Sequence, residues 1–401
     1  MSGRIVFTGA GAITSIGAGV EAFEQALYAG QSGVARSERL GGATAAEIVD
    51  FTPVPWLGNK GIRVLDRAAR LLCVAAQMAL TGGGKTIDPA DEGDPESGLV
   101  CGTMFGGVHS IATFDYTSAT EGPSQVNPAD FPNTVINSPT GHAGIKFKLR
   151  GVNSTICAGF ASGLQAIGYA ADFLRFGRAK WILAGGLEEL CEESSEGFLR
   201  AGLASTDGVV RPFGRYRNGT VPGEGAGLWL LETEETARGR GLVPLGEVRG
   251  FGAAHDAGSM RGIHASGAGA ALAMRQAIAS AGLAAADIAC IFASANGSRL
   301  ADEIEARAIA EVFGSAGAAP PVCAPKAAWG EAMGASGGLA AVAAGIALQR
   351  QLLPPTARLD TSDFGLRLSA EAQPISGQHA LINSIGCDGM NVSLVVSSWR
   401  E

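Results

Sequence analysis

The chain has 401 residues, of which 46% are hydrophobic, 17% are charged and 59 are glycine. This composition excludes a disordered chain and favours a densely packed α/β protein, because glycine allows tight turns and close backbone approach. The net charge of -8 argues against nucleic acid or an anionic membrane as the main partner, although a local basic patch could still receive an acidic carrier protein.

The cysteines and the N-terminal sequence predict where the protein resides. The seven cysteines have no C-x-x-C spacing and stand at positions 73, 101, 157, 191, 290, 323 and 387. This scattered set indicates buried small side chains in a reducing compartment, and neither a disulfide framework nor a metal site. The sequence MSGRIVFTG leads directly into a strand, without a signal peptide or an apolar run of about 18 residues. We therefore expect a cytoplasmic protein without a membrane segment.

The first hundred residues predict alternating strands and helices. Arg4 to Gly11 indicates a strand that enters a glycine turn. It partly matches the dinucleotide fingerprint, but Thr14 replaces the third glycine, so we favour a tight turn and expect no cofactor. Helices are expected around Val20 to Ala29 and over Arg63 to Leu80, and a short buried strand is expected over Leu99 to Gly102.

The segment from Gly151 to Gly186 predicts a strand, a tight turn, a buried helix and a second buried strand. Apolar residues with helical spacing run from Leu164 to Leu174, and Gly177 is placed to end the helix. A sharp strand-to-helix turn holds its residue over the helix N-terminus, where the dipole lowers a thiol pKa and favours an anion. This arrangement is typical of a nucleophile elbow.

The elbow resembles the active site of the β-ketoacyl synthases, in which a cysteine two residues before a Ser-Gly pair opens the helix. Ser162 and Gly163 form that pair, so the nucleophile position is held by Phe160. A phenyl ring has no lone pair to attack a thioester, and covalent catalysis at this position is excluded. Cys157 lies three residues too early.

Further motifs extend the resemblance over nearly the whole chain. The opening strand is similar to the family's VTG-x-G start, Arg211 to Gly214 to its RPFD motif, and Gly223 to Gly227 to its GEGAG motif. The resemblance implies the thiolase fold, with two similar halves in an α/β/α/β/α arrangement. We place the halves at residues 1–242 and 243–401, although no internal sequence repeat proves a duplication.

The family also needs two histidines and a lysine to stabilise the enolate formed by decarboxylation. The matching positions hold Asn296, Lys326 and Glu331, and none of the five histidines of the chain falls on them. Asn296 can donate a hydrogen bond but cannot shuttle a proton. Because a carboxylate would repel the enolate, we expect Glu331 to form a structural ion pair with Lys326.

Four other residues are candidates for binding the acyl chain. Residues 111 to 137 lack clean periodicity, which by itself indicates a surface excursion. In the family, however, the corresponding segment crosses the dimer interface and helps to wall the partner's acyl tunnel. We therefore assign substrate binding to Phe114, Tyr116 and Phe131, together with Cys387, which replaces the aromatic residue that gates the family's acyl pocket.

The joint loss of the nucleophile and both histidines resembles a chain-length factor, the β-subunit of a type II polyketide synthase. The resemblance implies a heterodimer with an active ketosynthase, an acyl carrier protein as second partner, and a polyene or aromatic product. Two alternatives stay open. The first is an active acyltransferase or condensing enzyme that uses Cys157, and the second is a non-catalytic homodimer that binds an acyl ligand or a carrier.

Overall fold

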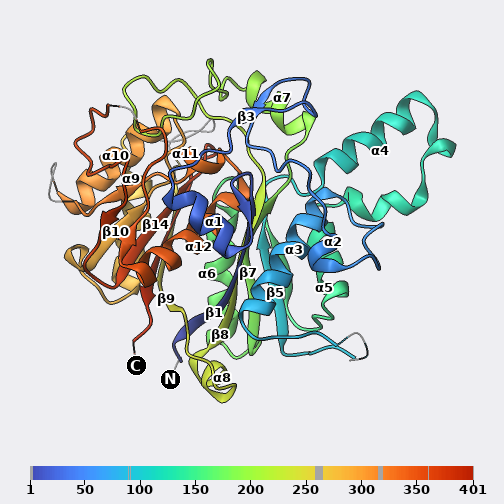
Figure 1. The fold of residues 1–401 in the computed structure, drawn as a ribbon, viewed down its shortest axis with the longest axis horizontal. Helices are drawn as coiled ribbons and strands as arrows, with labels where there is room; N and C mark the ends of the chain where they lie inside the picture. Colours follow the sequence, from blue (N-terminus) through green and yellow to red (C-terminus); the bar gives the residue numbers. More distant parts are fainter. Residues whose placement is uncertain are drawn as a thin grey trace.

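The structure is a computed structural model that describes residues 3–88, 90, 92–257, 265–314, 319–359 and 361–400. Within these residues, one large mixed sheet of eleven strands runs through the molecule, and helices cover it (Figure 1). No helix in this part of the chain is long and apolar enough to cross a membrane.

The N-terminal part of the chain forms one side of the sheet. In spatial order its strands are β1 (Ile5–Thr14), β8 (Gly225–Thr233), β7 (Trp181–Glu188), β5 (Ser97–Gly102) and β6 (Asn153–Ile156), and β2 (Gly17–Ala18) pairs with β1. The β7–β5–β6 pairs are parallel, whereas β8 is antiparallel to both of its neighbours. The short strand β6 lies at the end of the sheet.

The C-terminal part forms the other side. Its strands, in order, are β9 (Gly246–His255), β15 (Met390–Ser398), β14 (His379–Ile385), β10 (Ile288–Phe292) and β11 (Val322–Cys323). The two sides join where β1 pairs with β9, over only three residues of each strand. This narrow junction lets the two half-sheets face each other across a central helical layer.

Helices form three layers around the two half-sheets. The central helices α6 (Ser162–Arg175) and α12 (Gly334–Arg350) contact strands of both halves. The outer helices are α3 (Arg67–Gly82) and α5 (Ser138–Lys146) on one side, and α9 (Ala268–Ser280) and α10 (Arg299–Phe313) on the other (Figure 1). The layers therefore follow the order α/β/α/β/α, and the predicted thiolase-type fold is confirmed.

Small residues allow α12 to lie between the sheets. Fifteen of its residues are buried, and most of them are glycine or alanine. A Cβ atom at Gly338 would lie 2.2 Å from the carbonyl oxygen of Gly227 and 2.7 Å from the nitrogen of Gly186. Only glycine fits at this position, because the helix packs directly on the backbone of two strands. The GEGAG motif thus contributes a contact surface for the central helix.

Shorter elements complete the fold. They are α1 (Val20–Tyr28), β3 (Ala35–Arg36), β4 (Thr44–Ala45), α2 (Val54–Leu57), α7 (Glu192–Arg200), α8 (Glu234–Gly239), η3 (Ala285–Asp287), α11 (Lys326–Trp329), β12 (Leu352–Leu353) and β13 (Gln373–Pro374).

One sequence prediction needs correction, and one segment holds elements that were not predicted. The helix expected from Arg63 begins at Arg67, because the side chain of Asp66 accepts a hydrogen bond from the backbone N–H of Ala69 at 2.8 Å and caps the helix. Residues 108–137, which we call the arm, contain regular elements that the sequence analysis did not predict. They contain α4 (Val108–Thr120), η1 (Pro123–Gln125) and η2 (Pro128–Thr134), and the arm projects from the body (Figure 1). No residue of α4 is buried, so no hydrophobic stripe marked it in the sequence.

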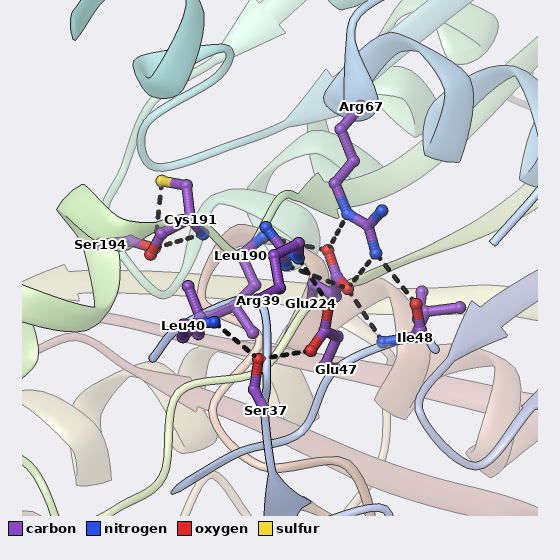
Figure 2. Close-up of polar contacts among 10 residues, drawn as sticks. All are labelled: Ser37, Arg39, Leu40, Glu47, Ile48, Arg67, Leu190, Cys191, Ser194 and Glu224. Carbon is purple, nitrogen blue, oxygen red and sulfur yellow. Dashed lines mark hydrogen bonds and ion pairs between the residues drawn. The ribbon is translucent and has the colours of Figure 1, made fainter. Parts of the chain in front are cut away.

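The glutamate of the GEGAG motif ties the N-terminal segment to the sheet (Figure 2). Glu224 is fully buried and accepts hydrogen bonds from the backbone N–H groups of Ile48 at 2.9 Å and Leu190 at 3.1 Å. The guanidinium of Arg67 binds the same carboxylate at 2.7 and 2.6 Å. The charge is thus paired and fully hydrogen-bonded, as a buried carboxylate requires. Through the Leu190 N–H it positions the loop after β7, which leads into α7.

Candidate functional site

The predicted elbow is present between β6 and α6. The chain turns at Gly159, which has a φ of 54°, and α6 begins at Ser162. The Ser162 hydroxyl accepts from the backbone N–H of Ala158 at 2.9 Å and donates to the carbonyl oxygen of Gly159 at 2.6 Å, so it fixes the turn. Phe160 lies in this turn directly before the helix. The structure therefore places a phenyl ring where a nucleophile elbow presents its reactive atom.

The ring of Phe160 is packed into an apolar cluster. The side chain is 4% exposed, and its ring stacks on that of Phe198 with the centroids 6.1 Å apart. Met333 completes the buried part of the cluster, and Cys387 packs against it from the C-terminal loop. The carbonyl oxygen of Phe160 also accepts a hydrogen bond from the hydroxyl of Ser384 at 2.9 Å. The elbow is thus closed by packing and anchored to β14.

The other three residues that the sequence analysis matched to catalytic positions meet in one buried network. Glu331 Oε2 accepts hydrogen bonds from Lys326 Nζ and from Asn296 Nδ2, each at 2.7 Å. Its second oxygen, Oε1, accepts from the Ser336 hydroxyl at 2.9 Å and from the backbone N–H of Met333 at 3.0 Å. Glu331 is 0% and Lys326 3% exposed. The expected ion pair between Lys326 and Glu331 is confirmed.

The network pairs the polar groups of these residues with one another. One N–H of the Asn296 side-chain amide is bound to Glu331. The ammonium of Lys326 is paired with the same carboxylate and lies 5.7 Å from the centroid of the Phe160 ring.

Glu331 also supports a strained backbone that the sequence did not reveal. Met333 has φ 47° and ψ −118°, a conformation that residues other than glycine rarely adopt. Its N–H is held by Glu331, and its side chain is fully buried in the cluster around Phe160. The Glu331 carboxylate therefore fixes the turn that starts α12.

Cys157 lies outside this arrangement. It is exposed, and its thiol donates a hydrogen bond to the carbonyl oxygen of Met104 at 3.4 Å. It precedes the turn and is not placed at the N-terminus of α6. Cys387, by contrast, is half-buried beside Phe160, and burial raises the pKa of its thiol.

The predicted acyl-binding aromatics do not join the elbow, because all three lie on the arm. The rings of Phe114 and Phe131 pack against each other with their centroids 5.9 Å apart. Phe114 lines a cavity of about 490 Å³ between α4 and the segment that contains η2. Tyr116 is 69% and Phe131 60% exposed. Of the four predicted acyl-binding residues, only Cys387 is thus brought to the inherited active-site positions.

The sequence analysis also did not identify two consecutive buried carboxyl groups at the end of β7, those of Glu188 and Glu189. Glu188 accepts hydrogen bonds from the backbone N–H groups of Met104 and Gly334 at 2.7 and 3.0 Å, which link the β5 loop to α12 beside the elbow. Burial raises its pKa to about 7 against the effect of these donors. For Glu189, burial and then the charge of Asp66 raise the pKa to about 8.

These shifts predict a stability that falls with rising pH. Folded Glu189 keeps its proton up to about pH 8, whereas the carboxyl of the unfolded chain loses its proton near pH 4.5. The contribution of Glu189 to the free energy of unfolding is therefore complete below pH 4.5 and is lost as the pH rises through 8. Glu189→Gln is expected to reduce the loss of unfolding free energy between pH 5.5 and 8.5 by at least about 1 kcal/mol. Guanidinium denaturation at both pH values measures this difference. Equal losses in the variant and the wild type would contradict it.

Comparison with known proteins identifies the family. Residues 2–237 match the family model described as "Beta-ketoacyl synthase, N-terminal domain", and residues 245–360 match "Beta-ketoacyl synthase, C-terminal domain". The fold and the elbow define a condensing-enzyme scaffold. The chain belongs to the beta-ketoacyl synthase family.

Relatives match over the full length of the chain. The 3-oxoacyl-[acyl-carrier-protein] synthase 2 of Rhizobium meliloti (strain 1021) is 31% identical and that of Vibrio harveyi 30%, each with 99% of both chains covered. Among solved structures, "The ishigamide ketosynthase/chain length factor" is 31% identical with a TM-score of 0.93 over 100% of both chains. A beta-ketoacyl synthase from Burkholderia phymatum STM815 is 27% identical with a TM-score of 0.91, covering 99% of this chain and 100% of the other.

Proposed function

We propose that this chain is a non-catalytic chain-length factor that pairs with an active ketosynthase and helps to shape the acyl tunnel of the complex. The observation that carries the proposal is that Phe160, Asn296 and Glu331 stand at the positions predicted for the nucleophile and the two histidines, while the retained Lys326 is paired with Glu331. In this proposal the partner condenses the chain, an acyl carrier protein delivers the building blocks, and the product is a polyene or aromatic polyketide. We also propose that the chain is built from two similar halves, residues 1–242 and 243–401.

The comparisons support membership of the family, but only the residues of the site distinguish a catalytic chain from a non-catalytic one. The curated relatives are named as synthases, whereas a solved structure of equal identity is named as a ketosynthase/chain length factor. Overall identity therefore does not separate a catalytic chain from a non-catalytic one. Phe160, Asn296 and Glu331 favour the non-catalytic function, because none of them can act as a thiol nucleophile or as an imidazole donor.

An exposed face beside the elbow supports the proposed partner. Strand β6 pairs with β5 on one side, and no described strand pairs with its other edge. Large apolar side chains are exposed on the arm and on the neighbouring α5, namely Tyr116, Phe131, Val135, Ile136 and Ile145. An open strand edge beside exposed apolar side chains is typical of a protein interface. We propose that the ketosynthase covers this face.

The arm offers a test of the proposed tunnel. Phe114→Ala in the assembled complex is expected to lengthen the polyketide by at least one two-carbon extension, because removing the ring enlarges the cavity between α4 and η2. Tyr116→Ala and Phe131→Ala test the two exposed aromatics in the same way. Mass spectrometry of the released products measures chain length. Unchanged length in all three variants would contradict the assignment of these residues to the tunnel wall.

Co-purification tests the proposed pairing. The chain should co-purify with an active ketosynthase in a one-to-one complex, and should aggregate or lose stability when it is produced alone. A stable homodimer that does not bind the ketosynthase would favour the alternative of an acyl- or carrier-binding protein. The exposed face could then be covered by a second copy of this chain. The other alternative, catalysis by Cys157, predicts an acyl adduct on this chain that disappears in Cys157→Ala.

A further inference from the structure

An open groove of about 970 Å³ lies against α7. The helix forms one wall, the β3–β4 hairpin a second, and residues 204–208 with residues 220–222 a third. The helix turns Phe198 inward to the elbow cluster and leaves Leu199, which lines the groove, 64% exposed. The described lining shares no residue with the exposed face that we assign to the ketosynthase, so the groove is a separate surface.

Contacts within the chain fix the walls of the groove. Leu40 of the hairpin packs in a buried cluster with Leu190, which lies just before α7. In the third wall, the N–H of Ser205 donates to the carbonyl oxygen of Thr220 at 2.6 Å, and the Ser205 hydroxyl accepts from the N–H of Val209 at 3.1 Å. Because the groove is already formed, a ligand needs to order few protein groups when it binds.

The charged side chains of the groove are all acidic. Its described lining contains no lysine, arginine or histidine, and its four carboxylates are those of Glu192, Glu193, Glu196 and Asp207. The dipole of α7 accounts for Glu192 and Glu193, which lie in the first turn of the helix. It does not account for Glu196 and Asp207. Four carboxylates around one groove favour a cationic ligand.

Cations outside the lining neutralise these carboxylates only in part. Three ion pairs occur, with N–O distances of 3.1, 2.6 and 2.8 Å, namely His109–Glu193, Arg200–Glu196 and Arg211–Asp207. All three pairs are partly exposed, so solvent weakens them and a ligand cation can share their carboxylates. Glu192 has no ion-pair partner within the part of the chain that the structure describes.

Apolar side chains complete the lining and favour a peptide over a simple polycation. They belong to Leu40, Ala43, Leu199, Ala204, Val221 and Pro222. Glu192 and Glu196 lie about 6 Å apart along the axis of α7. Alternate side chains of an extended peptide have nearly the same spacing, about 6.6 Å, and the residue between them points the other way. A Lys-x-Lys segment therefore presents two ammonium groups to α7 and an apolar side chain to the other walls.

We propose that this groove docks an extended segment of a partner protein in which lysines alternate with apolar residues. The lysines pair with Glu192 and Glu196, and their apolar stems cover Leu199. The apolar residues between them contact Leu40 and Val221. The inference goes beyond the proposed function, because the segment occupies neither the elbow nor the face assigned to the ketosynthase. It holds whichever chain carries out condensation.

Fluorescence anisotropy with a labelled hexapeptide of alternating lysine and leucine tests the proposal on the full-length chain in its purified assembly. The peptide should bind at least about tenfold more tightly than a glutamate–leucine hexapeptide and severalfold more tightly than a lysine–serine hexapeptide. Glu192→Lys combined with Glu196→Lys should weaken binding at least about tenfold, and Leu199→Ser severalfold. All three side chains are exposed, so the variants should fold, and circular dichroism verifies this.

Two variants outside the groove are matched controls. Glu303, like Glu196, forms an ion pair with an arginine four residues later, but it lies on α10. Glu303→Lys therefore controls for a change of net charge. Leu272→Ser controls for the loss of an apolar surface residue, since Leu272 is 45% exposed on α9. Both variants should bind the lysine–leucine peptide as the wild type does.

Undetectable binding of the lysine–leucine peptide, or equal binding of the glutamate–leucine peptide, would overturn the proposal. Equal weakening by Glu303→Lys and by the double substitution would also overturn it, because binding would then follow net charge alone. Full displacement of the peptide by equimolar spermidine would show that the groove takes any polycation, and would likewise contradict a peptide site. None of these outcomes depends on whether the chain limits polyketide length.

Discussion

Glu331→Ala is expected to lower the free energy of unfolding by about 3–5 kcal/mol, because it leaves the charge of Lys326 buried without its partner. The substitution also removes the acceptor for Asn296 and for the N–H of Met333, whose backbone is strained. Guanidinium denaturation of the purified protein measures the loss. Glu331 is completely buried, so little solvent screening reduces the effect.

Two controls separate the buried ion pair from general effects of substitution. Glu196→Ala breaks an exposed ion pair with Arg200 and should cost less than about 1 kcal/mol. Replacing both buried partners, as in Lys326→Met with Glu331→Leu, should recover most of the stability lost by Glu331→Ala, because no unpaired charge remains. A single substitution Glu331→Ala that costs no more than Glu196→Ala would contradict a structural role of the network.

Phe160→Ala should destabilise the fold by about 3–5 kcal/mol and leave polyketide elongation by the assembled complex within about twofold of the wild type. The stability loss follows from the burial of the ring against Phe198 and Met333. Elongation is unaffected because the condensing groups are proposed to belong to the partner. Denaturation of the complex gives the first quantity, and product formation per mole of one-to-one complex gives the second.

Phe176→Ala is the matched control, since this phenylalanine is 76% exposed at the end of α6 and should affect neither quantity. A large loss of elongation by a Phe160→Ala complex that is still assembled would show that the ring takes part in the reaction cycle. Unchanged stability would show that the ring does not fill the elbow as proposed.

Local patterns in the sequence predicted the elbow and its surroundings well. The Ser-Gly pair placed Phe160 in the turn before α6, and the charges of Lys326 and Glu331 predicted their ion pair, which the structure confirms. These predictions succeeded because a strand-to-helix turn and a short Lys–Glu spacing are defined by residues close together in the chain. The layered fold was predicted for a related reason, since buried strands and helices alternate along the sequence.

Contacts between distant segments could not be predicted in the same way. Nothing in the sequence around Glu305 indicates that one of its oxygens has no hydrogen-bond partner among the described residues, because this depends on how distant segments pack. The strained backbone of Met333 is likewise held by its hydrogen bond to Glu331 and lies in the buried cluster with Phe160 and Phe198. The helix α4 was missed since it buries no residue, and the exposure of Tyr116 and Phe131 depends on a surface that the single chain does not cover.

Intact-mass analysis after acyl loading tests the central proposal most directly. The complex of this chain with an active ketosynthase is incubated with an acyl thioester, and the mass of each subunit is measured. An acyl adduct confined to the ketosynthase in a one-to-one complex is the result that we predict. An adduct on this chain that is lost in Cys157→Ala would contradict the proposal and would identify the chain as an enzyme in its own right.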